Sequence, residues 1–83
     1  MSYFVYAVYN SQSNKIYIGQ TTDIIKRVAQ HNDPSFPKFT SRYKGGWIMI
    51  YKEILLSKAD MIKREKELKS YQGRKFIRQH IPG

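Results

Sequence analysis

The stretch from Lys15 to His31 constrains the fold more than any other part of the chain. Its first apolar residues, Ile16-Tyr17-Ile18, are β-branched or aromatic and end at Gly19, which predicts a short strand. A threonine pair then precedes apolar residues at helical spacing, namely Ile24, Ile25, Val28 and Ala29. The sequence therefore predicts a strand, a glycine and a helix that runs to about His31, with Thr21 or Thr22 as its N-cap.

A strand, a glycine and a helix can hold side chains from two elements around one point. The side chains that could form such a site here are those of Tyr17, Arg27 and His31. Arg27 and His31 are four residues apart, so they are neighbours on a helix, at the edge of its apolar stripe. A capped helix with a solvated arginine and histidine would give the same local pattern. The choice between a site and a solvated helix depends on the rest of the chain.

The preceding residues predict a β-hairpin. Tyr3 to Tyr9 is apolar on both faces, as expected for the middle strand of a sheet that helices cover on at least one face. The run Asn10–Asn14 consists of turn-forming residues. The first strand should therefore pair with Lys15–Gly19.

The register of this hairpin decides whether Tyr6 and Tyr17 share a face. A four-residue loop that closes Tyr9 onto Asn14 would set Tyr6 opposite Tyr17. A five-residue loop would put the two rings on opposite faces, because side chains alternate along a strand. The residues alone do not choose between these registers.

The second half of the chain predicts one more strand and two more helices. Trp47 to Leu56 is nearly all apolar and is expected to be an inner strand. Ser57, with an acid three residues later, predicts the start of a helix that runs to about Tyr71. A short basic helix, Arg74–His80, is expected after an interrupting glycine. We therefore expect an α+β fold, a small three-stranded antiparallel sheet flanked by helices, as a single domain over residues 1–83.

The charge of the chain is strongly positive. Fifteen lysines and arginines face six acids, which gives a formal net charge of +9. Such an excess predicts a polyanionic partner, most simply nucleic acid, although a merely soluble basic surface is the alternative. No predicted helix combines a basic face with a large apolar one, which disfavours a membrane. The absence of cysteine excludes thiolate metal sites and fits a reducing compartment, so we expect a cytoplasmic protein.

Two basic segments are candidates for nucleic-acid contacts. The first is the segment that follows the helix ending near His31, where three bases alternate with Phe36, Phe39 and Tyr43. Bases among aromatic rings suit a nucleic-acid strand through phosphate contacts and stacking, but the rings could equally pin a long loop to the core. The second is the last helix. The candidate residues are Lys38, Arg42, Lys44, Arg74, Lys75 and Arg78.

One carboxylate lies where an apolar residue is expected. On a helical wheel Glu65 falls within the apolar arc formed by Met61, Ile62, Leu68 and Gln72, whereas Glu67 faces solvent with Lys63. A carboxylate on an apolar face must be paired, protonated or bound to a cation. One reading is a salt bridge from Glu65 to Arg27 or a nearby lysine. The other is a ligand for one hard divalent ion, because a two-metal cage needs several clustered carboxylates.

The order of these residues resembles the GIY-YIG nuclease family, in particular its short stand-alone bacterial members. The family includes the cleavage domain of an excision-repair nuclease. Tyr17-Ile18-Gly19, preceded at a short distance by Phe4-Val5-Tyr6, is similar to the paired signature that gives the family its name. Arg27, His31 and later Glu65 follow in the family's order.

The resemblance implies a metal-dependent endonuclease that hydrolyses phosphodiester bonds in DNA. By resemblance, Tyr17 or Tyr6 takes the proton from the attacking water, and Arg27 steadies the phosphate charge. Glu65 then holds a single Mg²⁺ or Mn²⁺ ion against the leaving oxygen. His31 is the hydrogen-bond partner that tunes the base. We further expect Tyr6, Tyr17, Arg27, His31 and Glu65 to converge on one concave surface.

Gly19 is expected to allow the backbone to approach the phosphate, because it has no side chain. Two departures from the family pattern stand out. Phe4 replaces the first glycine of the signature, and no asparagine follows Asn32 although many relatives carry a late one near the site. Specificity should depend on DNA structure or on a partner protein rather than on base sequence.

Two other functions stay open. One is a non-catalytic DNA- or RNA-binding module on the same fold, and the other is a small RNA- or ribosome-associated protein.

Overall fold

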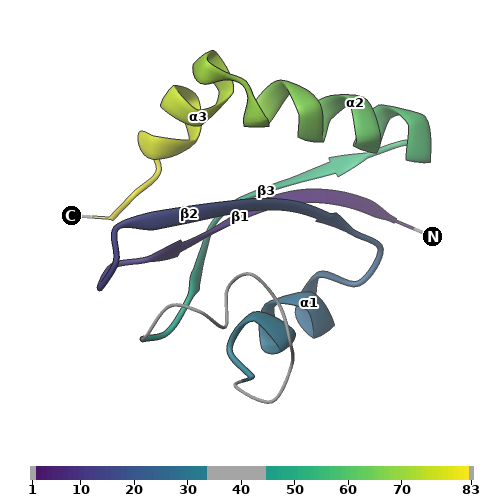
Figure 1. Ribbon diagram of the computed structural model, residues 1–83. Helices are drawn as coiled ribbons and strands as arrows, with labels where there is room; N and C mark the ends of the chain where they lie inside the picture. The colour runs from purple at the N-terminus through teal and green to yellow at the C-terminus, as the bar shows by residue number, and fades with distance from the viewer. Residues whose placement is uncertain (1, 34–44, 83) are drawn as a thin grey trace.

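The computed structural model describes residues 2–33 and 45–82. It contains three strands and three helices within these ranges: β1 (Tyr3–Asn10), β2 (Lys15–Thr21), α1 (Ile24–His31), β3 (Ile48–Leu55), α2 (Lys58–Lys69) and α3 (Tyr71–Arg78). The strands form one antiparallel sheet in the order β2-β1-β3. Helix α1 covers one face, and α2 and α3 cover the other (Figure 1). The predicted α+β class is confirmed.

Strand β1 is the middle strand, as its two apolar faces predicted, whereas the prediction of an inner β3 was wrong. Among the described strands β3 pairs with β1 alone and forms an edge of the sheet. An apolar run does not distinguish an inner strand from an edge strand when part of that run is exposed. In β3, Ile48, Met49 and Ile54 are exposed, and Lys52 interrupts the run.

The hairpin register places Tyr6 and Tyr17 on the same face. Asn10 pairs with Lys15, so Tyr6 lies opposite Gly19 and Tyr17 lies opposite Val8. The loop has four residues, as in the register that would pair Tyr9 with Asn14 and set the two tyrosines opposite each other. In the structure, however, the closing pair is Asn10 and Lys15, one position later on each strand. The shift of two residues preserves the face, because side chains alternate along a strand.

Helix α1 begins at a different cap from the one predicted. Asp23 is the N-cap, and its carboxylate accepts a hydrogen bond from the Lys26 amide at 3.1 Å. Thr21 instead ends β2, and its hydroxyl accepts from the Asp23 amide at 3.0 Å. The threonine therefore fixes the bend before the helix, and the aspartate satisfies one of the first free amides of the helix.

The junction between α2 and α3 also differs from the prediction. Ser57 caps α2 as expected, but α2 ends at Lys69, and Ser70 caps α3. Gly73 lies inside α3 and does not interrupt a helix. A Cβ atom at Gly73 would come within 2.2 Å of the Glu67 carbonyl oxygen, closer than any side-chain carbon can approach. The glycine thus permits close packing of the two helices.

Two buried clusters hold the layers together. The cluster between the sheet and α2–α3, here called the aliphatic face, contains Val5, Ala7, Ile18, Met61, Leu68 and Ile77. The cluster between the sheet and α1, here called the aromatic face, contains Tyr6, Val8 and Trp47, with Tyr17, Ile24 and Val28 packed against them. No helix within the described ranges is long and apolar enough to cross a membrane.

Candidate active site at the edge of strand β2

A tyrosine and a histidine form a buried pair on the aromatic face. Tyr6 is fully buried on β1, and its hydroxyl oxygen lies 2.7 Å from Nε2 of His31, the last residue of α1. Burial raises the pKa of the Tyr6 hydroxyl above its ordinary value, and Tyr17 and the negative charge of Glu65 raise it further. The positive charge of Arg27 opposes this rise. Tyr6 is therefore a neutral phenol at neutral pH.

Tyr17 completes an aromatic cluster around this pair. Its ring centroid lies 4.9 Å from that of His31 and 6.5 Å from that of Tyr6. Tyr17 is half-buried on the edge strand, in contrast to the fully buried Tyr6. Of the two tyrosines, Tyr17 is thus the one whose side chain lies partly in solvent.

Gly19 makes room for both tyrosines. A Cβ atom at this position would lie 2.7 Å from the Tyr6 hydroxyl oxygen and 2.9 Å from Cε1 of Tyr17. Both distances are shorter than real Cβ contacts, so any side chain would displace the rings. The structure thus gives Gly19 a role in packing the two tyrosines, which the sequence did not indicate.

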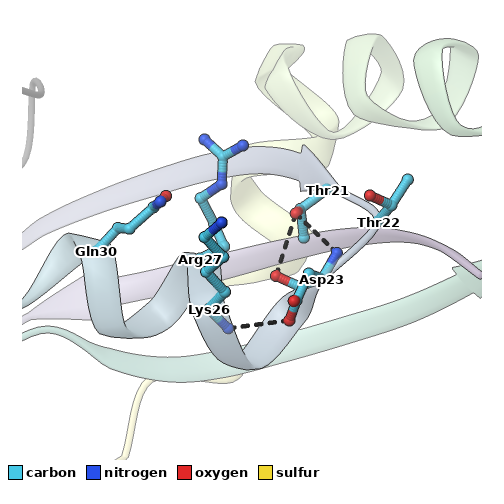
Figure 2. Close-up of a pocket in the computed structure, with 6 residues that line it drawn as sticks. All are labelled: Thr21, Thr22, Asp23, Lys26, Arg27 and Gln30. Atoms are coloured by element: carbon cyan, nitrogen blue, oxygen red, sulfur yellow. Dashed lines mark hydrogen bonds between the residues drawn. The ribbon is translucent and has the colours of Figure 1, made fainter.

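Arg27 lines a pocket of about 350 Å³ at the start of α1 (Figure 2). The other lining residues are Thr21, Thr22, Asp23, Lys26 and Gln30. In Figure 2 the guanidinium of Arg27 extends away from the Asp23 carboxylate, which is engaged with the helix backbone. The positive charge of Arg27 partly offsets the rise in the pKa of Tyr6, so the two residues interact electrostatically.

Glu65 comes from the opposite layer. It lies on α2, which packs on the aliphatic face, and its side chain is 16% exposed. Its Oε1 atom accepts from Gln20 Nε2 at 3.4 Å and lies 3.6 Å from Lys69 Nζ. Gln20 directly follows Gly19 on the edge strand, and the charge of Glu65 reaches Tyr6.

The five expected site residues therefore do not share one face of the sheet. Tyr6, Tyr17, Arg27 and His31 lie on the side of α1, whereas Glu65 approaches from the side of α2. The two groups meet around the outer edge of β2, beside Gly19 and Gln20. The sequence did not indicate Gln20 as a contact of Glu65, because nothing in the chain order links a strand residue to a helix forty-five residues later.

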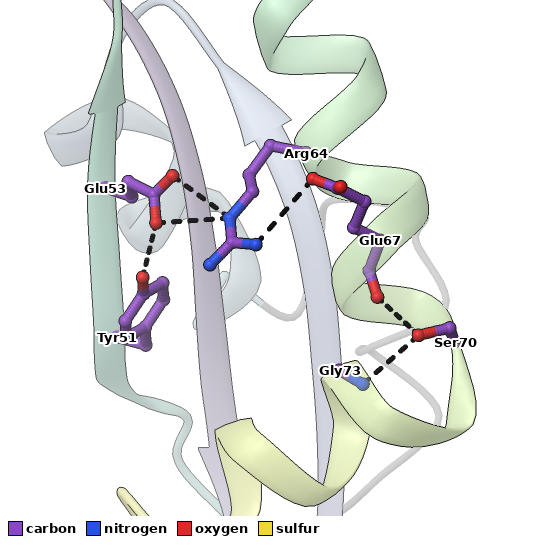
Figure 3. A network of polar contacts seen from close by, with 6 residues as sticks. All are labelled: Tyr51, Glu53, Arg64, Glu67, Ser70 and Gly73. Carbon is purple, nitrogen blue, oxygen red and sulfur yellow. Dashed lines mark hydrogen bonds and ion pairs between the residues drawn. The ribbon is translucent and has the colours of Figure 1, made fainter.

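The carboxylate of Glu53, on β3, has closer hydrogen-bond partners than that of Glu65. Glu53 accepts from Arg64 Nε at 3.0 and 3.2 Å and from the Tyr51 hydroxyl (Figure 3). Arg64 also pairs with Glu67 at 3.7 Å, so Glu67 has an arginine partner one turn away instead of the expected Lys63. Glu53 is thus held by short contacts of the kind that serve structure. Glu65 has only the longer contacts to Gln20 and Lys69 within the described part of the chain.

The basic candidates divide into two groups. Lys38, Arg42 and Lys44 lie outside the described residues. Arg74, Lys75 and Arg78 are exposed on α3. Arg74 and Lys69 line a groove of about 270 Å³ with Ile16, Tyr17 and Ile18, so one predicted base lies beside the tyrosine cluster.

Comparison with known proteins identifies the family. The GIY-YIG catalytic domain model matches residues 2–78. The chain belongs to the GIY-YIG family. A UPF0213 protein of Staphylococcus aureus is 34% identical over 77 residues, which cover 93% of this chain and 92% of that protein. A UPF0213 protein of Staphylococcus haemolyticus is 29% identical over 76 residues, covering 92% and 90%. The predicted membership among short stand-alone bacterial proteins is confirmed.

The fold also matches a solved structure. The solution NMR structure of a UPF0213 protein from Bacillus halodurans has a TM-score of 0.57, with 23% identity over 95% of this chain and 84% of that one. The GIY-YIG family is a nuclease family whose members generally use a divalent metal and act on DNA.

The residues at the edge of β2 are compatible with a divalent ion that takes few of its ligands from the protein. The described residues contain no group of three or more His, Cys, Asp or Glu that could hold a metal. A dedicated protein cage is therefore not formed by this part of the chain. Mg²⁺ instead tolerates one carboxylate, several waters and substrate phosphate. The carboxylate of Glu65 offers a hard oxygen donor of the kind that such a site would use.

Proposed function

We propose that this GIY-YIG protein is a divalent-metal-dependent endonuclease that hydrolyses phosphodiester bonds in DNA. The observation that carries the proposal is the state of Glu65. This largely buried carboxylate has only a long amide contact and an exposed lysine as described neighbours, and its charge reaches the tyrosine cluster. A buried carboxylate with such weak compensation is poised to take a cation.

Tyr17 is the proposed general base. A tyrosine accepts a proton from water only as the phenolate, a state that nearby positive charge, such as that of an arginine, a lysine or a bound divalent ion, favours. Tyr6 is a poor candidate because its pKa is raised by burial and its hydroxyl already contacts His31. Tyr17 lies partly in solvent at the sheet edge, where an attacking water has access. The Tyr6–His31 pair then serves to hold the ring of Tyr17 in place, because both rings contact it. Arg27 binds the scissile phosphate and neutralises the charge that grows on it.

Glu65 is the proposed ligand of a single Mg²⁺ or Mn²⁺ ion. When bound, the ion supplies positive charge near the leaving oxygen. Gln20 donates to the same carboxylate and thereby fixes its orientation. The cleavage site is thus expected at the outer edge of β2, with Tyr17 and Arg27 on one side of the strand and Glu65 on the other.

Cleavage assays test the proposal directly. Purified protein is incubated with supercoiled, branched and single-stranded DNA, with Mg²⁺, with Mn²⁺ and with a chelator. We expect at least one DNA form to be cut with either ion and none with the chelator. Cutting that survives chelation would contradict the proposed role of the metal.

A non-catalytic DNA- or RNA-binding module is the second candidate. The ion pair between Glu65 and Lys69 favours it, because an ordinary helix pair of this kind requires no metal. This candidate predicts nucleic-acid binding without metal-dependent cleavage of any DNA form.

The proposed DNA partner predicts salt-sensitive binding. Affinity should fall steeply with salt and depend little on sequence, because phosphate contacts release counterions and carry no base information. Charge reversal at Arg74, Lys75 and Arg78 together should weaken binding and flatten the salt dependence. Charge reversal at Lys58 and Lys63, on exposed positions of α2, is the control. Affinity that does not change between low and physiological salt would contradict a nucleic-acid partner.

A further inference from the structure

Lys69 lies close both to the Glu65 carboxylate and to the groove beside Tyr17. It lies at the end of α2, one turn after Glu65, and its ammonium nitrogen is 3.6 Å from the Glu65 carboxylate. Lys69 also lines the groove of about 270 Å³ that contains Tyr17. Its side chain is 45% exposed, so packing encloses little more than half of it. One residue thus connects the proposed metal ligand with the surface beside the proposed base.

The groove has the character of a phosphate site. Its described lining contains two cations, Lys69 and Arg74, and no acid. The Nε atom of Arg74 donates to the Lys69 carbonyl oxygen at 3.1 Å, which anchors Arg74 at the end of α2. Both side chains are exposed. A DNA backbone that places one phosphate near Arg27 would find further cationic groups here, along the same edge strand.

We propose that Lys69 exchanges partners during the reaction cycle. It neutralises Glu65 while no divalent ion is bound, and it contacts a DNA phosphate in the groove once the ion occupies Glu65. The inference rests on the proposed function, in which Glu65 is the metal ligand. It adds a second phosphate subsite, formed by Lys69 and Arg74, and a link between that subsite and the metal.

Energetics favour the exchange. A helix pair of glutamate and lysine four residues apart contributes only about 0.3–0.5 kcal/mol, so a divalent ion displaces the lysine at little cost. The ion then repels the ammonium group, and a phosphate in the groove attracts it. Binding of the divalent ion and binding of DNA should consequently strengthen each other, since each removes the partner that competes with the other.

Metal affinity of the free protein provides the first test. Mn²⁺ binding is followed by electron paramagnetic resonance, which needs neither DNA nor activity. Lys69→Gln should bind Mn²⁺ about twofold or more tighter than the unmodified protein, the factor that corresponds to the lost pair. Lys69→Arg should retain the original affinity. Lys66→Gln removes the same charge from an exposed position of α2 and should have a smaller effect.

The outcomes separate the inference from the proposed function. Equal Mn²⁺ binding by the unmodified protein and Glu65→Gln would overturn both, because Glu65 would not be the ligand. Binding that depends on Glu65 but is no tighter in Lys69→Gln than in Lys66→Gln would overturn only the partner exchange. Thermal melting of each variant verifies that the fold is retained.

DNA affinity provides the second test. Binding to uncut DNA is measured with Ca²⁺, and again with a chelator. Lys69→Gln should lose affinity several-fold with Ca²⁺ and much less with the chelator, where Lys69 is held by Glu65. An equal loss under both conditions would overturn the exchange, because Lys69 would then contact DNA regardless of Glu65.

Discussion

The two faces of the sheet each carry a buried cluster, but the clusters differ in chemistry. The aliphatic face is closed by residues such as Val5, Leu68 and Ile77, which carry no polar side-chain atoms. The aromatic face buries the Tyr6 hydroxyl and the imidazole of His31 in direct contact. Burying a polar group is costly unless it is hydrogen-bonded, and the contact between Tyr6 and His31 offsets that cost. We infer that the buried cluster of the aliphatic face supplies stability and that the aromatic face holds the proposed general base, while Glu65 reaches the edge of β2 from the side of α2.

Removal of the Tyr17 hydroxyl should have the largest effect of the single changes that test this division. Tyr17→Phe keeps the ring that packs on Tyr6 and His31 but removes the proposed proton acceptor. We expect cleavage to fall by about 10²–10⁴-fold, the usual contribution of a general base, with little change in stability. The measurement is the rate of DNA cleavage. Tyr71→Phe, at an exposed position, is the control. A rate that stays within twofold, taken as roughly the scatter of such assays, would remove Tyr17 from the mechanism.

Truncation on the aliphatic face should act on stability instead. Leu68→Ala removes a side chain that is 1% exposed, and we expect a loss of about 2–5 kcal/mol in the free energy of unfolding. Chemical denaturation measures this loss. Leu56→Ala, at a position that is 94% exposed, should change it by less than about 0.5 kcal/mol. The cleavage rate per folded molecule should stay unchanged in both variants. A rate loss in folded Leu68→Ala would show that the two faces are not separable.

Tyr6→Phe should have the smallest effect. The variant loses the 2.7 Å hydrogen bond to His31, which should lower the free energy of unfolding by about 1–2 kcal/mol. We expect cleavage to fall far less than in Tyr17→Phe, because the proposed role of Tyr6 is only to support the ring cluster. A loss in Tyr6→Phe that exceeds the loss in Tyr17→Phe would exchange the roles of the two tyrosines.

The same variant reveals the raised pKa of Tyr6. In the folded protein Tyr6 keeps its proton above the pH at which an unfolded tyrosine ionises, near pH 10. Its contribution to stability is therefore fully present below about pH 10 and is lost as pH rises further, at up to about 1.4 kcal/mol per pH unit. Denaturation of the unmodified protein and Tyr6→Phe between pH 8 and pH 11 should show this difference. Parallel pH profiles would contradict the raised pKa.

The sequence predicted what depends on local pattern. The central position of β1 followed from its two apolar faces, and the cap of α2 followed from Ser57. The unusual position of Glu65 followed from its place on the helical wheel. In each case neighbouring residues carry the signal, so no tertiary information is needed.

The sequence could not predict what depends on how the layers meet. The hairpin register decides which face carries Tyr17, and turn-forming residues allow more than one register. Gly73 was expected to interrupt a helix. Its role in the close approach of α2 to α3 could not be predicted, because that approach is a tertiary contact. The expectation of one concave surface overlooked that α1 and α2 cover opposite faces of the sheet.

The contact between Lys69 and Glu65 could have been predicted from the sequence. Glu65 and Lys69 are four residues apart, which predicts a helix pair. The position of Lys69 in a groove with Tyr17 could not be predicted, because the groove is formed by a strand and two helices from distant parts of the chain.

The proposed site is tested most directly by measuring DNA cleavage and DNA binding by the Glu65→Gln variant. The change keeps the shape of the side chain and its contact with Gln20 but removes the charge that a divalent ion requires. Glu67→Gln, on the same helix and paired with Arg64 at the surface, is the matched control. We expect Glu65→Gln to fold, to bind DNA at least as tightly, to lose cleavage by orders of magnitude, and to show no rise in melting temperature with Mg²⁺. A folded Glu65→Gln protein that cleaves at the original rate, with unchanged dependence on Mg²⁺, would contradict the proposed site.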